Sequence, residues 1–369
     1  MKILNLTTHL NVGGISNYLA MTGSRLVRMG HEVLVVSSGG NFKEVLEKKR
    51  IRCVDISIRT KNEFHPKLFL ALPKITRLVK QEKFDLIHAH TRITQVLGNL
   101  VSKFTGVPLV TTCHGFFKPR LSRRLFGSWG KTVIAISPLV AEDLEQCHKV
   151  KRSRIRIVQN AIDLEDFEGR LLEKDPAALR ESWGIPQDMK VVASISRLVK
   201  DKGHDYLIEA VRDLKKKKVD VYLLIAGEGR ERKNLEKLIR KAGLEKQARI
   251  IDTRVDVTSI LSVTDIFVHP ATYREGFGLV LVEAMVAKKP VIATNIRAVN
   301  SLIRNHVNGF LVEPKSGKEL AEAIQFIMAN PKITVSIVEN AYQSATELYS
   351  IDRMVNELET VYEETIARP

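Results

Sequence analysis

The stretch KVVASISRLVKDKGHDYLIEAVRDLKKKKVDVYLLIA, residues 190–226, decides the fold class. It opens with Lys190–Ile195 and closes with Val221–Ala226, two apolar runs rich in β-branched residues that predict buried strands. Between them, Tyr206–Lys216 has the apolar spacing of an amphipathic helix. Two strands joined by such a helix predict a βαβ unit, in which both strands are parallel and share one sheet.

The same alternation extends in both directions along the chain. Further strands are expected at Lys2–Leu6, Glu32–Ser37, Phe84–Ala89, Leu109–Thr112, Thr132–Ile136, Arg154–Val158, Arg249–Ile251, Asp265–Val268, Val291–Ala293 and Gly309–Val312. Further helices are expected at Ile15–Met29, Phe69–Gln81, Arg230–Lys241, Leu279–Ala287 and Gly317–Met328, with two more after Pro331. This order predicts an α/β protein whose parallel sheets are covered by helices on both faces.

One segment interrupts the alternation. Residues 163–190 are highly charged and contain Pro176 and Pro186, which are typical of a connection between domains. We therefore predict two doubly wound, Rossmann-like domains, residues 1–165 and 190–349, that face each other across a deep cleft, with residues 166–189 as the linker. The length of 369 residues agrees, because single cores rarely grow beyond roughly 250–300 residues.

Composition excludes several classes of protein. Hydrophobic residues make up 44% of the chain and charged residues 27%, which is typical of globular proteins. No apolar run approaches the roughly 18 residues of a membrane-spanning helix, and the apolar residues after Lys2 are too few for a signal peptide. The three cysteines are widely separated and fit no disulfide framework or zinc motif. These observations predict a cytoplasmic protein.

The net charge of +16 is unevenly distributed. Residues 1–160 contain 27 Lys and Arg against 10 Asp and Glu, a balance of +17, and the rest of the chain has a balance of −1. A basic half predicts a polyanionic partner for that half: a nucleic acid, an anionic membrane surface or a phosphorylated substrate. The alternative is a solvated basic surface without a specific partner.

Two short motifs could hold phosphate groups. Gly13-Gly14 follows the first expected strand, where glycines can bring backbone N–H groups close to an anion, although the stretch is neither GxGxxG nor a P-loop. Arg197 lies two residues after the end of the expected strand Lys190–Ile195, and Lys202 comes five residues later. Two cations at the carboxyl end of a strand suit a diphosphate, and solvated loop charges are the alternative.

The stretch EGFGLVLVE, residues 275–283, begins and ends with a carboxylate. If Glu275 and Glu283 belong to one helix, the helical rise separates them by about 12 Å along its axis. The paired carboxylates of glycosidases lie only about 5–9.5 Å apart, so this spacing suits contacts with two ends of an extended ligand. Gly276 and Gly278 predict a tight entry into a helix whose N–H groups can face an anion.

His114 follows the expected strand Leu109–Thr112 and could donate a hydrogen bond to a substrate hydroxyl. A structural role is the alternative for a single histidine. His88 and His90 lie closer to a strand interior and receive no role, and no combination of ligands has the spacing of a metal site.

Together these motifs resemble the family-4 retaining glycosyltransferases of the GT-B architecture, which use nucleotide-sugar donors. The resemblance extends along nearly the whole chain. It rests on Gly13-Gly14, on Arg197-Leu198 with Lys202-Gly203, on Glu275 through Glu283, and on the downstream segments at residues 290–294 and 308–312.

The resemblance implies a role for each matching residue. Arg197 and Lys202 would hold the donor pyrophosphate, Glu275 would contact sugar hydroxyls, and Glu283 would bind the ribose. His114 and Gly14 would touch the sugar and the phosphate from the other domain. The implied catalytic residues are Arg197, Lys202, Glu275 and His114, and the implied donor-binding residues are Gly13, Gly14, Gly276, Phe277, Gly278, Leu279 and Glu283.

The resemblance also implies a reaction with retention of anomeric configuration that needs no metal and no cofactor. It implies that a C-terminal helix at about residues 350–369 crosses back to the first domain. Acceptors of similar enzymes are often lipid-linked, which implies lipopolysaccharide, lipid-linked or other cell-surface glycan synthesis. The aromatic and basic segment Phe116–Trp129 then predicts peripheral attachment to the inner face of the cytoplasmic membrane, unless it is an amphipathic helix packed on its own sheet.

Other readings of the sequence stay open. A GT-B phosphorylase or a sugar-nucleotide epimerase shares the expected fold with different chemistry. A basic nucleic-acid-binding protein is less favoured, because the chain has no recognised nucleic-acid motif, and no nucleic-acid partner is expected. The sequence names neither the sugar nor the base, acceptor or linkage.

Overall fold

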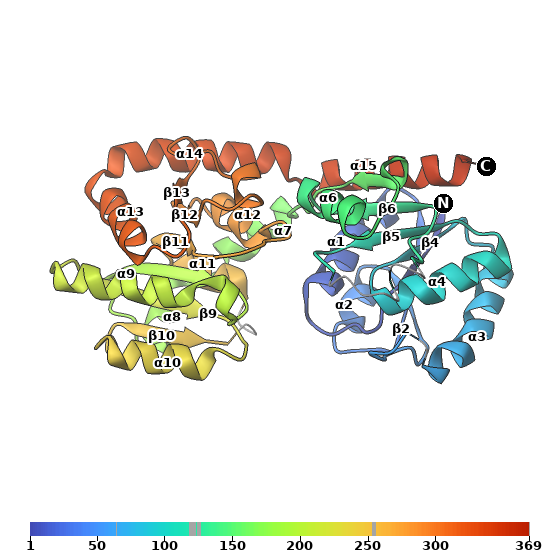
Figure 1. Ribbon diagram of the computed structural model, residues 1–369, viewed down its shortest axis with the longest axis horizontal. Coiled ribbons are helices and arrows are strands. Elements are labelled where there is room, and N and C mark those ends of the chain that lie inside the picture. Colours follow the sequence, from blue (N-terminus) through green and yellow to red (C-terminus); the bar gives the residue numbers. More distant parts are fainter. Residues whose placement is uncertain (64, 118–122, 124–126, 253–255, 369) are drawn as a thin grey trace. The chain divides into compact units, whose positions relative to one another are not determined.

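The computed structural model describes residues 1–63, 65–117, 123, 127–252 and 256–368. The chain forms two compact units: unit 1 comprises residues 1–160 with 351–369, and unit 2 comprises residues 161–350. Each unit is a parallel sheet flanked by helices (Figure 1). The expected pair of doubly wound α/β domains is thus confirmed.

Unit 1 contains a seven-stranded sheet of order β3-β2-β1-β4-β5-β6-β7. Its strands are β1 (Lys2–Leu6), β2 (Glu32–Ser37), β3 (Arg52–Asp55), β4 (Leu86–Ala89), β5 (Leu109–Cys113), β6 (Thr132–Ala135) and β7 (Ile155–Ile157). The chain builds outward from β1 to β3 and then returns to add β4 on the other side of β1. The order reverses between β1 and β4, and ligands of such sheets bind at this point, beyond the carboxyl ends of the strands.

The helices of unit 1 cover both faces of its sheet. They are α1 (Gly14–Arg28), α2 (Lys43–Lys48), α3 (Pro66–Glu82), α4 (Arg92–Thr105), α6 (Pro138–Gln146) and α15 (Ile351–Ala367), with a 3₁₀ turn at Arg152–Arg154. The last of them, α15, packs against α1, and the side chain of Tyr362 is completely buried in unit 1.

Unit 2 repeats this topology with six strands in the order β10-β9-β8-β11-β12-β13. The strands are β8 (Lys190–Ile195), β9 (Val221–Ala226), β10 (Ala248–Ile251), β11 (Ile266–His269), β12 (Val291–Thr294) and β13 (Phe310–Val312). The helices are α7 (Leu164–Leu172), α8 (Pro176–Ser182), α9 (His204–Lys216), α10 (Arg232–Lys241), α11 (Val257–Val263), α12 (Leu279–Val286), α13 (Gly317–Ala329) and α14 (Pro331–Leu348), with 3₁₀ turns η2 (Lys200–Lys202) and η3 (Val299–Ser301). The order reverses between β8 and β11.

The segment expected to be a linker, residues 166–189, instead belongs to unit 2. Its helices α7 and α8 both pack against α11, and Phe167 of α7 is 2% exposed. Pro176 begins α8 rather than breaking it, because the first helical position needs no N–H donor. The Asp175 side chain accepts hydrogen bonds from the N–H groups of Ala177 and Ala178 and so caps the helix.

The structure also contains one strand that the sequence did not predict. β3 is a four-residue edge strand with no fully buried residue, so its sequence RCVD lacks the apolar run of an interior strand. Among the described helices, none combines the length and apolar character needed to cross a membrane.

Candidate functional site

The reversal of strand order in unit 2 places two loops side by side. β8 pairs with β11 in parallel, so the segments that follow both strands leave the same edge of the sheet. The first segment carries Arg197 and Lys202, and the second carries Glu275. Residues that lie 73 positions apart in the sequence are thereby brought into contact.

Backbone contacts join the two loops. Gly203 has φ 64°, in the left-handed region that favours glycine, and a Cβ there would collide with the carbonyl oxygen of Pro270. The N–H of Thr272 donates to the carbonyl of Asp201 at 2.9 Å. Any side chain at position 203 would therefore push the loop containing Lys202 away from the end of β11.

This close approach creates a cluster of three charged or polar side chains. The Lys202 ammonium pairs with Glu275 Oε2, and Nε2 of His269 lies 3.0 Å from the same oxygen. The N–H of Gly276 donates to the other oxygen, Oε1, at 3.1 Å. The Lys202 and Glu275 side chains are 11% and 16% exposed, so water screens their interaction only weakly.

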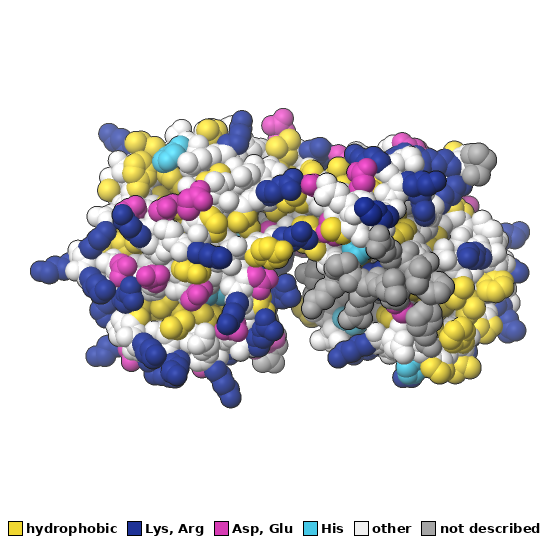
Figure 2. All heavy atoms as spheres, in the orientation of Figure 1, with side chains coloured by type: hydrophobic (Ala, Val, Ile, Leu, Met, Phe, Trp, Pro, Cys, Tyr) yellow, Lys and Arg dark blue, Asp and Glu magenta, His cyan; other side chains and the backbone are white. Residues whose placement is uncertain are grey.

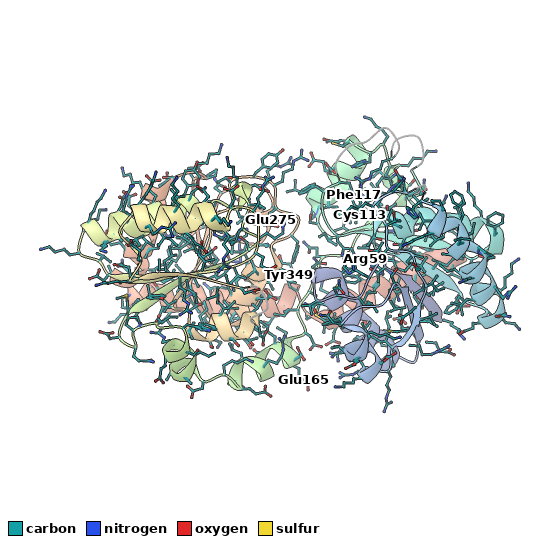
Figure 3. The ribbon with its side chains drawn as sticks, turned by 90° about the horizontal axis from the view of Figure 1, so that it is seen from below. Arg59, Cys113, Phe117, Glu165, Glu275 and Tyr349 are labelled. Carbon is teal, nitrogen blue, oxygen red and sulfur yellow. The ribbon has the colours of Figure 1, made fainter. Side chains whose placement is uncertain are left out.

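The cluster stabilises the charge of Glu275. Burial alone would raise the pKa of this carboxyl, but the hydrogen bond from His269 and the Lys202 charge outweigh burial and hold the pKa well below its usual range. Glu275 (labelled in Figure 3) is therefore an anion with its partners in place.

Arg197 differs from Lys202 in its surroundings. Its side chain is exposed, and it forms no ion pair with any residue that the structure describes. The guanidinium thus stays available to an incoming anion, and its planar donors suit a diphosphate. The structure brings Arg197 and Lys202 to the end of the same strand, as their sequence positions indicated.

The segment from Glu275 to Glu283 is not one continuous helix. α12 begins only at Leu279, after Gly278 with φ 91°, so Glu275 lies in the loop and the expected helical separation of about 12 Å does not apply. Phe277 is buried, and its ring packs edge-on against Tyr349, labelled in Figure 3, with 5.5 Å between the centroids. Only the backbone of Phe277 can therefore serve a ligand.

Glu283 lies in the second turn of α12 and is partly buried. The pKa of Glu283 is raised to about 7, chiefly by burial. The charge of Arg170 opposes this rise and the charge of Asp256 adds to it. Arg170 is already paired with Asp256 at 2.9 Å, which weakens its effect on Glu283. Among the described residues none hydrogen-bonds to this carboxylate, so hydroxyl donors of a ligand would find it unoccupied.

We expect Glu283→Gln to raise the melting temperature at about pH 8 and to leave it unchanged near pH 4. The folded pKa exceeds the ordinary value of 4.5, so ionisation of Glu283 destabilises the fold as the pH rises from that value through about 7. Removal of the charge relieves this effect only at the higher pH. The measurement is calorimetry at both pH values, with the exposed Glu245→Gln as the matched control. Equal melting temperatures for native and variant protein at high pH would contradict the assignment.

Unit 1 contains a second polar cluster, at the carboxyl ends of β4 and β5. Nδ1 of His90 lies 3.1 Å from Nε2 of His114, and Nε2 of His90 lies 2.9 Å from Oδ1 of Asn5. His88 is hydrogen-bonded to the Tyr362 hydroxyl and to Oγ1 of Thr112, both at 2.7 Å. The Tyr18 ring packs edge-on against His114 with 4.8 Å between centroids.

These histidines are neutral at physiological pH. Burial lowers the pKa of His88 to about 3 and that of His114 to about 4, and it holds the pKa of His90 well below the usual value. The amide oxygen of Asn5 only accepts, so His90 donates from Nε2 and accepts at Nδ1 from the Nε2–H of His114. Nδ1 of His114 is then an acceptor. This arrangement favours acceptance of a hydrogen bond from a ligand hydroxyl, whereas the sequence suggested donation.

The glycines after β1 do not form a turn that requires glycine. Gly13 has φ 163°, an extended conformation that any residue adopts, and a Cβ at Gly14 would meet no atom within 4 Å. α1 begins at Gly14, so the two glycines leave the N-terminus of this helix open to an approaching group.

Three histidines of these clusters had no role assigned from the sequence. His88 and His90 are two positions apart at the end of β4, a spacing that places both side chains on the same face of the strand. β4 pairs with β5, the strand that precedes His114, and this spacing was the signal available in the sequence. His269 is the last residue of β11, six positions before Glu275. Within the described residues, no group of three or more His, Cys, Asp or Glu side chains could hold a metal ion.

The expected membrane segment Phe116–Trp129 lies partly outside the described residues, which omit 118–122 and 124–126. Trp129 is 5% exposed and packs between Phe117 and His148, so it contributes to the core and is not available to a membrane.

Comparisons with known proteins agree with the geometry of both units. Residues 12–166 match the family model described as Glycosyltransferase Family 4, and residues 175–344 match the model described as glycosyl transferases group 1. An uncharacterized glycosyltransferase of Methanocaldococcus jannaschii is 26% identical, with 95% of this chain and 94% of the relative covered.

Two further similarities concern proteins with named ligands. The UDP-Gal:α-D-GlcNAc-diphosphoundecaprenol α-1,3-galactosyltransferase of Escherichia coli is 28% identical over 79% of this chain and 78% of its own. The crystal structure of an Anabaena protein in complex with UDP and glucose superposes with a TM-score of 0.84 and 25% identity, covering 99% of this chain and 100% of the other. The protein therefore belongs to the group 1 glycosyltransferases of family 4 and has their GT-B fold of two Rossmann-like domains.

Proposed function

We propose that the protein transfers a sugar from a nucleoside-diphosphate sugar to an acceptor hydroxyl, with retention of anomeric configuration. The observation that carries the proposal is the cluster of Lys202, Glu275 and His269 at the end of β8 and β11, with the exposed Arg197 in the same loop as Lys202. It combines cations for a diphosphate with a stabilised carboxylate for sugar hydroxyls. The Anabaena structure with UDP and glucose supports this class of donor.

In the proposed reaction the bond between the anomeric carbon and the diphosphate oxygen breaks as the acceptor oxygen bonds to that carbon. The leaving diphosphate gains negative charge, which Arg197 and Lys202 stabilise from fixed positions. The acceptor proton passes to the departing phosphate oxygen on the same face of the sugar, so no protein base is required. The charge is neutralised by side chains, and the proposed step needs neither a metal nor a cofactor.

The carboxylates of Glu275 and Glu283 contact different parts of the donor. Glu275 accepts from the sugar hydroxyls, aided by backbone N–H groups near Phe277 to Leu279. Glu283 accepts from the ribose hydroxyls, and His114 of unit 1 accepts from a sugar hydroxyl through Nδ1. Ionised carboxylates form stronger hydrogen bonds than neutral acceptors, so the charged Glu275 in particular favours a polyhydroxylated ligand.

We propose a lipid-linked or otherwise anionic glycan as the acceptor, and cell-surface glycan synthesis such as that of lipopolysaccharide as the setting. The excess of Lys and Arg in residues 1–160 supports an anionic partner for unit 1. The E. coli relative is named for an acceptor linked to diphosphoundecaprenol, which supports the same class. Peripheral attachment at the cytoplasmic face of the membrane would bring the enzyme to such an acceptor.

A thermal-shift screen against UDP-, GDP- and ADP-sugars tests the donor class. A ligand at about 100 times its Kd adds about 2.7 kcal/mol of stability, so one nucleotide series should raise the melting temperature by several degrees. Free sugars without a nucleotide serve as controls. A protein that none of the nucleotide sugars stabilises would contradict the proposal. Turnover of the stabilising donor with free phosphate alone, or its epimerisation without an acceptor, would replace transfer by phosphorolysis or epimerisation.

A further inference from the structure

Helix α3 has apolar side chains on two opposite faces. Leu68, Ala71, Ile75 and Val79 form its inner face and belong to the core of unit 1. The outer face carries Pro66, Phe69, Leu70 and Pro73, which are all exposed. Their spacing of i, i+3, i+4 and i+7 aligns them in one row along the helix, and we name this row the α3 stripe.

The α3 stripe is more exposed than scattered apolar surface residues usually are. Phe69 is 60% exposed and Leu70 is 70% exposed, next to each other in the first two turns of α3. Figure 2 shows hydrophobic side chains gathered on the surface where Figure 1 places this helix. A cluster of this kind at one place on a surface commonly marks an interaction site.

Cations surround the α3 stripe and continue it. Lys67 and Lys74 border it, while Arg77 and Lys80 extend the same row toward the C-terminal end of the helix. All four are exposed, and none forms an ion pair with a described residue. The only acid of α3 is Glu82 at its end, which is occupied by Lys2 and Arg52.

This combination fits a lipid surface. A single convex helix face encloses no small ligand, but it can lie in the plane of a bilayer with its apolar side chains at the boundary between headgroups and acyl chains. Unpaired Lys and Arg side chains beside such a row then meet the phosphates of anionic lipids. We propose that α3 docks this protein on an anionic lipid bilayer through the α3 stripe and its four cations.

The docking surface is separate from the segment Phe116–Trp129 and from the transfer site. It does not depend on which sugar, or whether any sugar, is transferred, because vesicle binding is measured without a donor. Failure of the nucleotide screen and failure of vesicle binding are thus independent results.

Co-sedimentation with vesicles tests the proposal in the full chain. The vesicles are phosphatidylcholine with one third phosphatidylglycerol, and pure phosphatidylcholine is the comparison. Phe69→Ser/Leu70→Ser removes the apolar contact and keeps every charge, while Lys74→Gln/Arg77→Gln/Lys80→Gln removes three charges and keeps the apolar contact. The matched control is Lys233→Gln/Lys237→Gln/Arg240→Gln on α10 of unit 2, which removes three exposed charges elsewhere.

We expect the native protein and the α10 control to bind the anionic vesicles, and neither to bind pure phosphatidylcholine strongly. Each lost cation should weaken binding about fivefold, so the triple variant of α3 should bind on the order of 100-fold more weakly. The double serine variant should lose at least about tenfold. Melting curves show whether each variant is folded, and only folded variants are compared.

Four results would overturn the proposal. If the double serine variant binds the anionic vesicles as strongly as the native protein does, the α3 stripe does not enter the bilayer. An equal loss in the α10 control would show binding through overall charge. Native protein that does not bind the anionic vesicles would remove the bilayer as the partner of this surface. Native protein that forms a dimer in solution, which the double serine variant converts to monomer, would assign the surface to another copy of the chain.

Discussion

Replacing Arg197 with alanine is expected to lower kcat by about 10²–10³ while the melting temperature stays unchanged. The side chain is exposed and forms no ion pair with any residue in the described part of the chain, so its removal costs the fold little. In the proposed reaction its charge acts on the leaving diphosphate, where a pre-placed cation stabilises the transition state. Steady-state kinetics with the donor found by the thermal-shift screen measures the effect.

Lys200→Ala is the matched control for this experiment. Lys200 is an exposed cation of the same loop, in the 3₁₀ turn η2, and has no assigned contact with the donor. Its removal should leave kcat close to native. Near-native turnover of Arg197→Ala, or an equal loss in both variants, would remove Arg197 from the site.

Replacing Lys202 with alanine is expected to lower kcat by a similar factor of about 10²–10³ and, in contrast, to destabilise the fold. Glu275 is 16% exposed and loses its cation, which costs about 1–3 kcal/mol even though His269 remains in contact. The pKa of Glu275 is depressed, so this contribution is complete above its ordinary value of 4.5 and is lost as the pH falls. The difference in melting temperature from the native protein should therefore shrink below that pH.

The double variant Lys202→Ala/Glu275→Gln separates stability from catalysis. Removal of the Glu275 charge together with its partner eliminates the uncompensated anion, so the melting temperature should recover most of the loss. The proposed reaction then lacks both the Lys202 cation and the Glu275 carboxylate, so kcat should stay low. Recovery of both quantities together would mean that Lys202 only maintains the structure.

The interior strands were predictable because their apolar runs are continuous. β1, β2, β8 and β9 have the limits expected from the sequence, since both faces of each strand are buried. Residues 166–189 were misread as a linker because they lack such a continuous apolar pattern. α7 and α8 are short, polar surface helices, and Phe167 alone gives too weak a pattern to distinguish them from a linker.

The sequence predicted candidate site residues but not the contacts between them. Arg197 and Lys202 lie in the loop that follows β8, and Glu275 lies in the loop that follows β11 and begins the motif of residues 275–283. The contact between Lys202 and Glu275 depends on β8 pairing with β11, which strand patterns do not specify. The acceptor state of His114 depends on His90 and Asn5, which belong to other strand ends.

The pairing of Lys202 with Glu275 has a consequence for the choice of ligand. The Lys202 ammonium is already paired with the Glu275 carboxylate. An incoming anion must therefore compete for this cation with a carboxylate that the fold keeps ionised. A sugar diphosphate supplies a phosphate to Lys202 and hydroxyls to Glu275, so both partners are satisfied after the exchange. Inorganic phosphate supplies no sugar hydroxyls and leaves two anions facing each other. In the proposed reaction the ion pair would therefore disfavour small anions that carry no hydroxyls, and it would favour a donor that carries both a phosphate and sugar hydroxyls.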